Sequence, residues 1–121
     1  MSAAQSDVQF FINNAGFSYD PRTQTKEEGR LQCAVRLADA EDVLMQAMRV
    51  CDVSVSWYDD ERMGDEPDDV EDVESCVIEI NGEAAASLSA IWDADANCRR
   101  VIRAELALEC LDQLRAVVGA A

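Results

Sequence analysis

The stretch SCVIEINGEAAASL, residues 75–88, decides the fold that the sequence predicts. Apolar residues alternate along its first half, the pattern of a strand with one buried face: Cys76, Ile78 and Ile80. Asn81-Gly82 follows, a pair that favours the tight turn of a β-hairpin. The sequence therefore predicts two antiparallel strands joined at this point.

The length of the turn sets which residues of the second strand face the core. A two-residue turn would align Ile78 with Ala85 and send Leu88 and Trp92 to the opposite face. A three-residue loop, Ile80–Gly82, with Gly82 in the left-handed region, instead aligns Ile78 with Ala84. That register places Ala86, Leu88, Ala90 and Trp92 on the face of Cys76 and Ile78. We therefore expect the three-residue loop.

The flanking segments predict one more strand and two helices. VSVSWY, residues 53–58, alternates as a one-sided strand. Upstream, Thr25 and Glu28 form a capping box, and apolar residues recur every three or four positions over 26–50, which indicates a helix. Its expected buried stripe is Cys33, Leu37, Ala40, Leu44, Ala47 and Cys51. A last helix is expected over about 96–118.

Residues 1–24 differ from this periodic part of the chain. They hold irregularly spaced aromatics, with a short strand possible at Val8–Ile12 before Asn13, Asn14 and Gly16. We expect an N-terminal arm whose aromatics either pack on the domain or contact a partner. Residues 25–121 are expected to form a single α+β domain. Its order is helix-strand-strand-strand-helix, with a three-stranded antiparallel sheet and two helices packed on one face.

This order of elements is similar to that of the double-stranded-RNA-binding domain, but the charge differs. That fold holds phosphates with basic loops and helix ends. Here the chain of 121 residues carries a net charge of −15. Such a charge repels nucleic acid and anionic membrane, so we expect neither as a direct partner. It favours a partner with a basic surface, or selection for solubility.

Ten carboxylates lie in the sixteen positions from Asp59 to Glu74, an expected insertion between the first two strands. Extended chain would give one charge per about 5 Å, and helix one per about 2.5 Å. Single-stranded DNA carries one per roughly 3.4 Å, so the density suits a groove built for phosphates. The run could equally be a self-repelling connector, although it would be a long one.

A carboxylate stripe on the final helix adds to this acidic surface. Like charges at these spacings weaken a helix, so an unforced solvent face would more often include lysines. We predict that both acidic segments contact a partner. The candidate residues are Asp59, Asp60, Glu61, Asp65, Glu66, Asp68, Asp69, Glu71, Asp72, Glu74, Glu105, Glu109 and Asp112.

Catalytic and metal chemistry find little support in the sequence. The chain has no histidine, no nucleophile elbow and no phosphate-binding glycine loop, and we expect neither an enzyme nor a cofactor. The five cysteines lack metal-binding spacing. Asp93, Asp95 and Asn97 begin like a calcium loop, but Cys98 and Ala104 stand where glycine and glutamate belong. Helix capping by Asp95 or Asn97 explains these residues more simply.

Two stretches resemble a group of small proteins encoded by tailed bacteriophages. They are NNAGFSYDPRTQTKEEGRLQCAVRLADAE, residues 13–41, and RRVIRAELALECLDQL, residues 99–114. The similar features are an aromatic-Asp-Pro turn, a Glu-Gly-Arg helix start followed by Cys-Ala, and an Ala-Glu-Leu-Ala-Leu-Glu final helix. The resemblance covers about half of the chain and includes no catalytic motif. It implies a phage origin, and small acidic phage proteins are often inhibitors of host defence, including anti-CRISPR proteins and DNA mimics.

These observations lead to three hypotheses. The first is a non-enzymatic, phage-encoded inhibitor acting in the host cytoplasm. It would dock its acidic surface in the basic nucleic-acid-binding groove of a host protein such as a CRISPR effector. The second is a phage structural or assembly protein that self-associates, for example as a homodimer, through Phe10, Phe11, Phe17 and Tyr19. The third is an acidic module that binds divalent ions. The sequence shows neither a signal peptide nor a run long enough to span a bilayer, so we expect an intracellular protein with reduced thiols.

Overall fold

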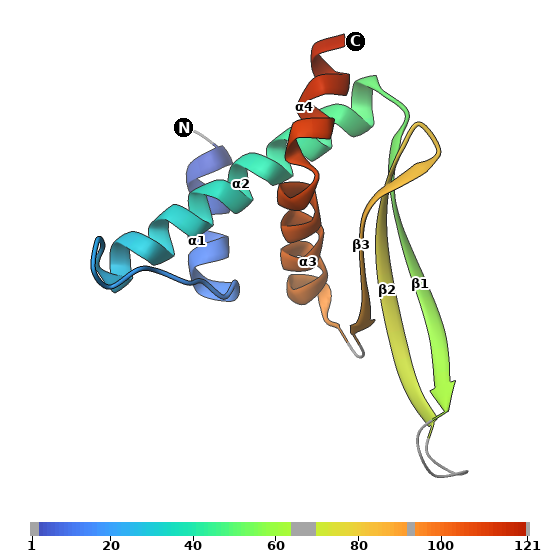
Figure 1. Ribbon diagram of the computed structural model, residues 1–121, viewed down its shortest axis with the longest axis horizontal. Helices are drawn as coiled ribbons and strands as arrows, with labels where there is room; N and C mark the ends of the chain where they lie inside the picture. The colour runs from blue at the N-terminus through green and yellow to red at the C-terminus, as the bar shows by residue number, and fades with distance from the viewer. Residues whose placement is uncertain (1–2, 64–69, 92–93, 121) are drawn as a thin grey trace.

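The computed structural model describes residues 3–63, 70–91 and 94–120, and it has the expected α+β architecture (Figure 1). The elements in chain order are α1 (Ala3–Asn14), α2 (Lys26–Val50), β1 (Val53–Met63), β2 (Val70–Ile80), β3 (Glu83–Ile91), α3 (Ala96–Glu109) and α4 (Leu111–Ala120). The strands form one antiparallel sheet in the order β1-β2-β3. The helices lie on one face of this sheet, where α3 contacts β2 and β3, and α2 contacts β1.

The helix α2 confirms the prediction for residues 26–50. The Thr25 hydroxyl accepts a hydrogen bond from the Glu28 amide at 3.1 Å, which caps the first turn. Four members of the expected stripe are buried: Leu37, Ala40, Leu44 and Ala47. The cysteines at its two ends are half-buried, and none of the five cysteines forms a disulfide. Their thiols lie against backbone carbonyls of Ser18 and Val117.

The expected turn between β2 and β3 is wrong by one residue. Ile80 pairs with Glu83, so the turn has two residues, Asn81 and Gly82, and their φ angles are 54° and 81°. Positive φ at both positions matches the turn that follows the twist of antiparallel strands. The predicted face is restored only for Ala86 and Leu88, because a register shift at Ile78/Glu79 aligns Ile78 with Ala86 and Cys76 with Leu88. A second shift, between Glu74 and Cys76, places Ile91 and not Ala90 opposite Glu74, so the expected face of Ala90 is wrong, and Trp92 lies outside the described residues.

The first two strands are longer than expected. We expected them to end near Tyr58 and to begin near Cys76, with an acidic insertion between. Instead β1 and β2 pair without a register shift from Val53↔Ile80 to Met63↔Val70. Most of the acidic segment is therefore part of the ladder itself, and residues 64–69 lie outside the described residues.

The strand expected at Val8–Ile12 is also wrong, since this segment lies in the helix α1. Phe11 is buried to 1 % exposure in a cluster with residues of α2 and α3. The helix ends at Asn14, whose side-chain amide donates to the Phe10 carbonyl at 2.8 Å. Burial of a large aromatic against two other helices outweighs the local signals that suggested a strand.

The final helix is divided at Cys110, where we expected one continuous helix over 96–118. Cys110 has φ −110° and ψ 25°, and its amide still donates to the Leu106 carbonyl at 3.2 Å. Both halves contribute to the main core. Leu106 and Ala107 of α3 and Leu114 of α4 are buried there against α2 and the sheet. α3 and α4 follow one another on the same side of the sheet (Figure 1).

Candidate partner-binding surface

The hairpin of β1 and β2 brings predicted site residues together across the ladder. Asp59 is opposite Glu74, Glu61 is opposite Asp72, and Arg62 is opposite Glu71. Asp60 lies in the same strand, opposite Val73. Opposed like charges destabilise a strand pair, so their placement is an energetic cost to the fold. Four further candidates, Asp65, Glu66, Asp68 and Asp69, lie outside the described residues.

The charge density of this ladder follows from its geometry. Six carboxylate residues occupy the four opposed rows that contain positions 59–62 and 71–74. At a rise of about 3.4 Å per residue, four rows extend over about 14 Å. Arg62 offsets one of them, so the net charge of −5 gives one charge per about 2.8 Å, between the spacing of duplex DNA at about 1.7 Å and of single-stranded DNA at about 3.4 Å. Pairing of the strands thus raises the density well above that of extended chain.

Glu74 has a second role, which is to attach the hairpin to α3. Its carboxylate forms an ion pair with the Arg99 guanidinium, which also lies 5.3 Å from the centre of the Trp57 ring. The hydrogen bond and charge of Glu74, together with the charge of Asp59, raise the pKa of Arg99. Trp57 is half-buried against the core, in agreement with its predicted place on the inner face. Glu74 is therefore less free to meet a partner than Asp59, which is exposed.

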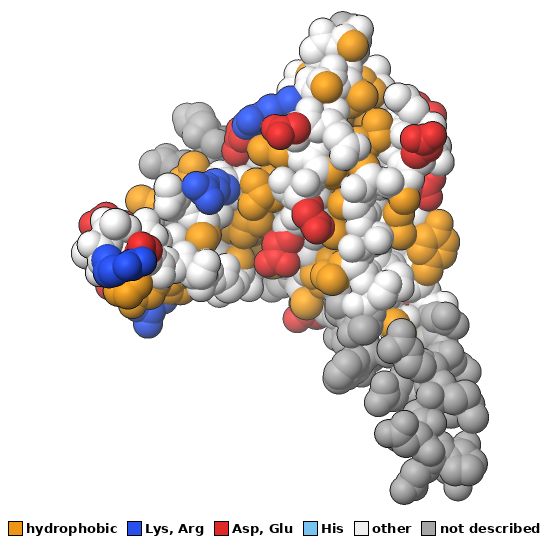
Figure 2. Space-filling view, in the orientation of Figure 1, with side chains coloured by type: hydrophobic (Ala, Val, Ile, Leu, Met, Phe, Trp, Pro, Cys, Tyr) orange, Lys and Arg blue, Asp and Glu red, His pale blue; other side chains and the backbone are white. Residues whose placement is uncertain are grey.

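The carboxylates of the last two helices are all exposed. Glu105 and Glu109 lie on α3, and Asp112 lies beyond the bend, on α4. Partial burial raises the pKa of Glu105. Figure 2 shows the acidic side chains of this face in separate groups, with apolar and uncharged surface between them. The hairpin is thus the denser of the two predicted acidic surfaces.

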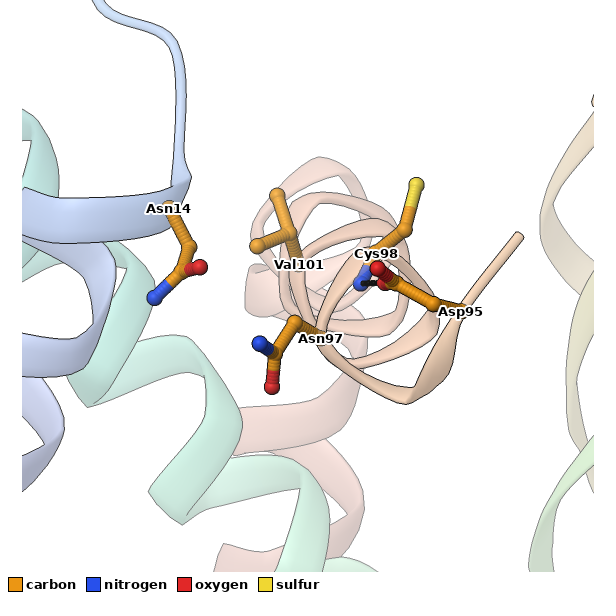
Figure 3. Close-up of a pocket in the computed structure, with 5 residues that line it drawn as sticks. All are labelled: Asn14, Asp95, Asn97, Cys98 and Val101. Atoms are coloured by element: carbon orange, nitrogen blue, oxygen red, sulfur yellow. Dashed lines mark hydrogen bonds between the residues drawn. The ribbon is translucent and has the colours of Figure 1, made fainter.

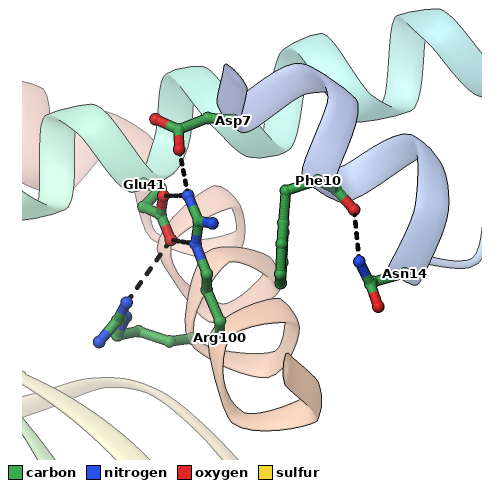
Figure 4. A network of polar contacts seen from close by, with 6 residues as sticks. Asp7, Phe10, Asn14, Glu41 and Arg100 are labelled. Atoms are coloured by element: carbon green, nitrogen blue, oxygen red, sulfur yellow. Dashed lines mark hydrogen bonds and ion pairs between the residues drawn. The ribbon is translucent and has the colours of Figure 1, made fainter. Parts of the chain in front are cut away.

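A buried ionic cluster that the sequence did not predict joins α1, α2 and α3 (Figure 4). Arg100 contacts both carboxylate oxygens of Glu41, one of them at 2.8 Å, and also pairs with Asp7. Arg103 lies 3.5 Å from the same Glu41 carboxylate. The Arg100 guanidinium is 4.1 Å from the centre of the Phe10 ring. The bonds to Glu41 and Asp7 outweigh burial and raise the pKa of Arg100.

This cluster is structural in character. Glu41 is 6 % exposed, the one charged residue that is buried among those the structure describes. Its partners are separated from it by 59 residues in the case of Arg100, and Arg100 from Asp7 by 93. A sequence pattern of short period carries no signal for such pairs. In the sequence, the only sign of this cluster was Glu41, a charged residue on the inner side of α2.

One pocket lies between α1 and the start of α3 (Figure 3). It has a volume of about 250 Å³ and is lined by Asn14, Asp95, Asn97, Cys98 and Val101. Asp95 caps α3 by accepting a hydrogen bond from the Cys98 amide at 2.7 Å, in agreement with the capping interpretation of the Asp93–Asn97 segment. Because the Asp95 carboxylate is already engaged, the pocket offers no convergent set of charged groups.

Metal and membrane features were also sought in the described part of the chain. Among residues 3–63, 70–91 and 94–120 no three Cys, Asp or Glu side chains are grouped as metal ligands. None of the helices described is long and apolar enough to cross a membrane. No protein-family model, curated protein or solved structure matches the chain, so the resemblance to phage proteins stays a prediction.

Proposed function

We propose that the protein is a non-enzymatic inhibitor that docks its β1–β2 hairpin in the basic, nucleic-acid-binding groove of another protein. The resemblance to phage proteins suggests a host defence protein, such as a CRISPR effector, as the target. The proposal assigns partner contact to the hairpin first, and to Glu105, Glu109 and Asp112 second.

The observation that carries the proposal is the uneven distribution of charge. Residues 53–95 hold fourteen of the twenty-five acidic residues and one of the ten basic residues, a net charge of −13. The other 78 residues have a net charge of only −2. In Figure 2 the basic side chains of the visible face lie at the N-terminal end of α2, part-way along α2 and beside α4. Selection for solubility alone would not require such a separation.

The opposed carboxylates of the hairpin support the same proposal. Arg99 offsets the charges at 59/74, but a fold free of other constraints would place an opposite or neutral residue across the ladder at 61/72. A partner with a basic groove would offset the repulsion and displace the cations around the hairpin carboxylates, as it displaces those condensed on nucleic acid. The cost of the hairpin in the free protein is then repaid in the complex.

The proposal is tested by capture of proteins from a bacterial host lysate with two immobilised variants of equal charge. The hairpin variant carries Asp59→Asn, Asp60→Asn and Glu61→Gln. The control variant carries Glu27→Gln, Asp42→Asn and Asp52→Asn, which lie at exposed positions of the helical part and its connection to β1. We expect the control to retain the proteins that the parent captures at low salt, and the hairpin variant to lose them.

Two results would overturn the proposal. One is equal capture by the hairpin variant and the parent, which would remove the hairpin as the contact surface. The other is equal loss in both variants, which would show that total charge matters and the hairpin does not. Circular dichroism of each variant checks that the fold is retained.

A further inference from the structure

β1 is an edge strand whose outer backbone is unpaired within the described sheet. The Asn81 amide donates to the Asp52 carbonyl at 2.7 Å, which starts the ladder between β1 and β2. Hydrogen-bonded rows alternate along antiparallel strands, so the rows bonded to β2 are those of residues 54, 56 and 58. The N–H and C=O groups of Val55, Trp57 and Asp59 consequently point away from β2.

The two edges of the sheet differ in how well they are protected. β3 has two register shifts against β2, and α3 packs on it. β1 pairs over eleven residues with no shift, and its sequence VSVSWYDDERM contains neither proline nor lysine. Bulges, prolines and charged side chains, lysine above all, are the usual means by which proteins prevent pairing at an edge. From Val53 to Tyr58 β1 has none of these, and its charged residues begin at Asp59, where they oppose a strand of like charge.

Charge selects what kind of strand can pair there. A second copy of this chain would bring another sheet segment with a net charge of −13 to the edge. An extended segment rich in Lys and Arg would meet the opposite sign, beginning at exposed Asp59, where β1 enters the acidic part of the hairpin. The carboxylates thus act against self-association and in favour of a basic strand.

We infer that the protein binds an extended, Lys/Arg-rich segment of its target by adding it as a fourth strand along β1. Backbone hydrogen bonds to Val55, Trp57 and Asp59 hold the segment, and the hairpin carboxylates select its charge. This inference rests on the proposed function, and it specifies how the basic surface of the target is engaged.

The test compares two synthetic peptides of equal charge. One alternates lysine and threonine over seven residues, with both ends blocked; the other has the same sequence with every amide N-methylated. N-methylation removes the donors needed for strand addition and leaves the charge unchanged. We expect the first peptide to bind the full chain at least tenfold more tightly, and to slow hydrogen exchange at the amides of Val55, Trp57 and Asp59.

Variants of the full chain separate backbone pairing from charge. Asp59→Pro removes an outward N–H at an edge position that tolerates proline, and Asp59→Asn removes the carboxylate alone. Ser87→Pro places a proline at an exposed position of the opposite edge. We expect Asp59→Pro to lower affinity for the first peptide about tenfold, and Asp59→Asn and Ser87→Pro to change it less than threefold.

Three results would contradict the inference. Equal affinity for both peptides would mean that charge alone binds them, which leaves the proposed function standing and removes strand addition. If neither peptide binds the chain at low salt, the inference is wrong. The same result would also count against the hairpin as a surface that binds basic partners. Protection of the same three amides in the free chain, rising with its concentration, would show that a second copy occupies the edge.

Discussion

Glu41 is the residue on which the packing of three helices converges. Its carboxylate is 6 % exposed and meets Arg100 and Arg103 of α3, while Arg100 also holds Asp7 of α1. Removing one member of a buried ionic group leaves charges without partners in a poorly solvated place. The stability of the helical part should therefore depend strongly on this one side chain.

We predict that Glu41→Gln lowers the free energy of unfolding by about 1–3 kcal/mol, because the partly buried Arg100 and Arg103 lose their shared anion while Arg100 keeps Asp7. The matched control is Asp39→Asn, which breaks the ion pair with Arg115 at 2.6 Å, where both side chains are about half exposed. That change should cost about 0–1 kcal/mol. Urea denaturation measures both, and similar losses in the two variants would contradict a structural role for the cluster.

Two buried thiols predict a loss of stability at alkaline pH. Burial raises the pKa of Cys76 from its ordinary value of 9.0 to about 11, with Arg103 opposing the shift. Burial also raises the pKa of Cys110. The folded state thus holds these protons more tightly than the unfolded state, so their contribution is complete below about pH 9 and is lost as pH rises toward 11.

For Cys76 alone the loss is about 2–3 kcal/mol across this range. Chemical denaturation at several pH values between 8 and 11 would measure it. Cys76→Ala removes the titrating group, so its stability should fall less steeply with pH than that of the parent. An identical slope in the variant would refute the assignment to Cys76.

At the scale of elements, the connection between α1 and α2 is held by a close approach at Gly29. A Cβ atom built on Gly29 would lie 2.3 Å from the Cβ atom of Tyr19. The Cβ of Tyr19 moves only with its backbone, so an added methyl group must displace the 15–24 segment. Asp20 reinforces this segment, since its carbonyl accepts bonds from the Thr23 and Gln24 amides.

We predict that Gly29→Ala destabilises the protein by about 1–3 kcal/mol. Gly119→Ala is the matched control, because a Cβ at Gly119 has nothing within 4 Å. There the better helix propensity of alanine should leave stability unchanged or raise it by up to about 1 kcal/mol. The midpoint temperatures of thermal unfolding of the two variants should therefore shift in opposite directions, or by clearly different amounts. Equal effects would show that the 15–24 segment can move to accommodate the added methyl group without loss of stability.

The elements that were predicted from sequence are those with a strong local period. The apolar stripe of α2 and the alternation in β1 and β2 follow from single segments, and the α+β architecture follows from their order. The predictions were wrong where contacts between residues distant in the sequence decide the local structure. α1 is a helix because Phe11 packs against α2 and α3, and the bulge at Ile78/Glu79 follows from the side chains that must face the core.

The sequence predicted the candidate site only in outline, again because contacts between residues distant in the sequence complete it. The density of carboxylates is visible in the sequence, but their opposed arrangement depends on the register of β1 against β2. The pairing of Glu74 with Arg99 depends on where α3 lies against the sheet. The exposed outer backbone of β1 is likewise a property of the sheet, and no residue type signals it.

At the scale of the whole molecule, the separation of charge is the central feature. A nearly neutral helical part supports a sheet segment with a net charge of −13. Contacts that replace phosphates release counterions, so affinity for a target should fall steeply as salt rises. Five such contacts would lower affinity by a factor on the order of 500 between 50 and 200 mM salt. A salt-independent affinity would indicate an apolar interface elsewhere on the molecule.

Competition for the captured target tests the central claim most directly. The purified target is titrated with this protein while the concentration of the target's own nucleic acid is raised. If the hairpin occupies the nucleic-acid groove, the apparent dissociation constant rises in proportion to the nucleic acid present, and no ternary complex forms. A ternary complex, with an affinity for this protein that the nucleic acid does not change, would contradict the account.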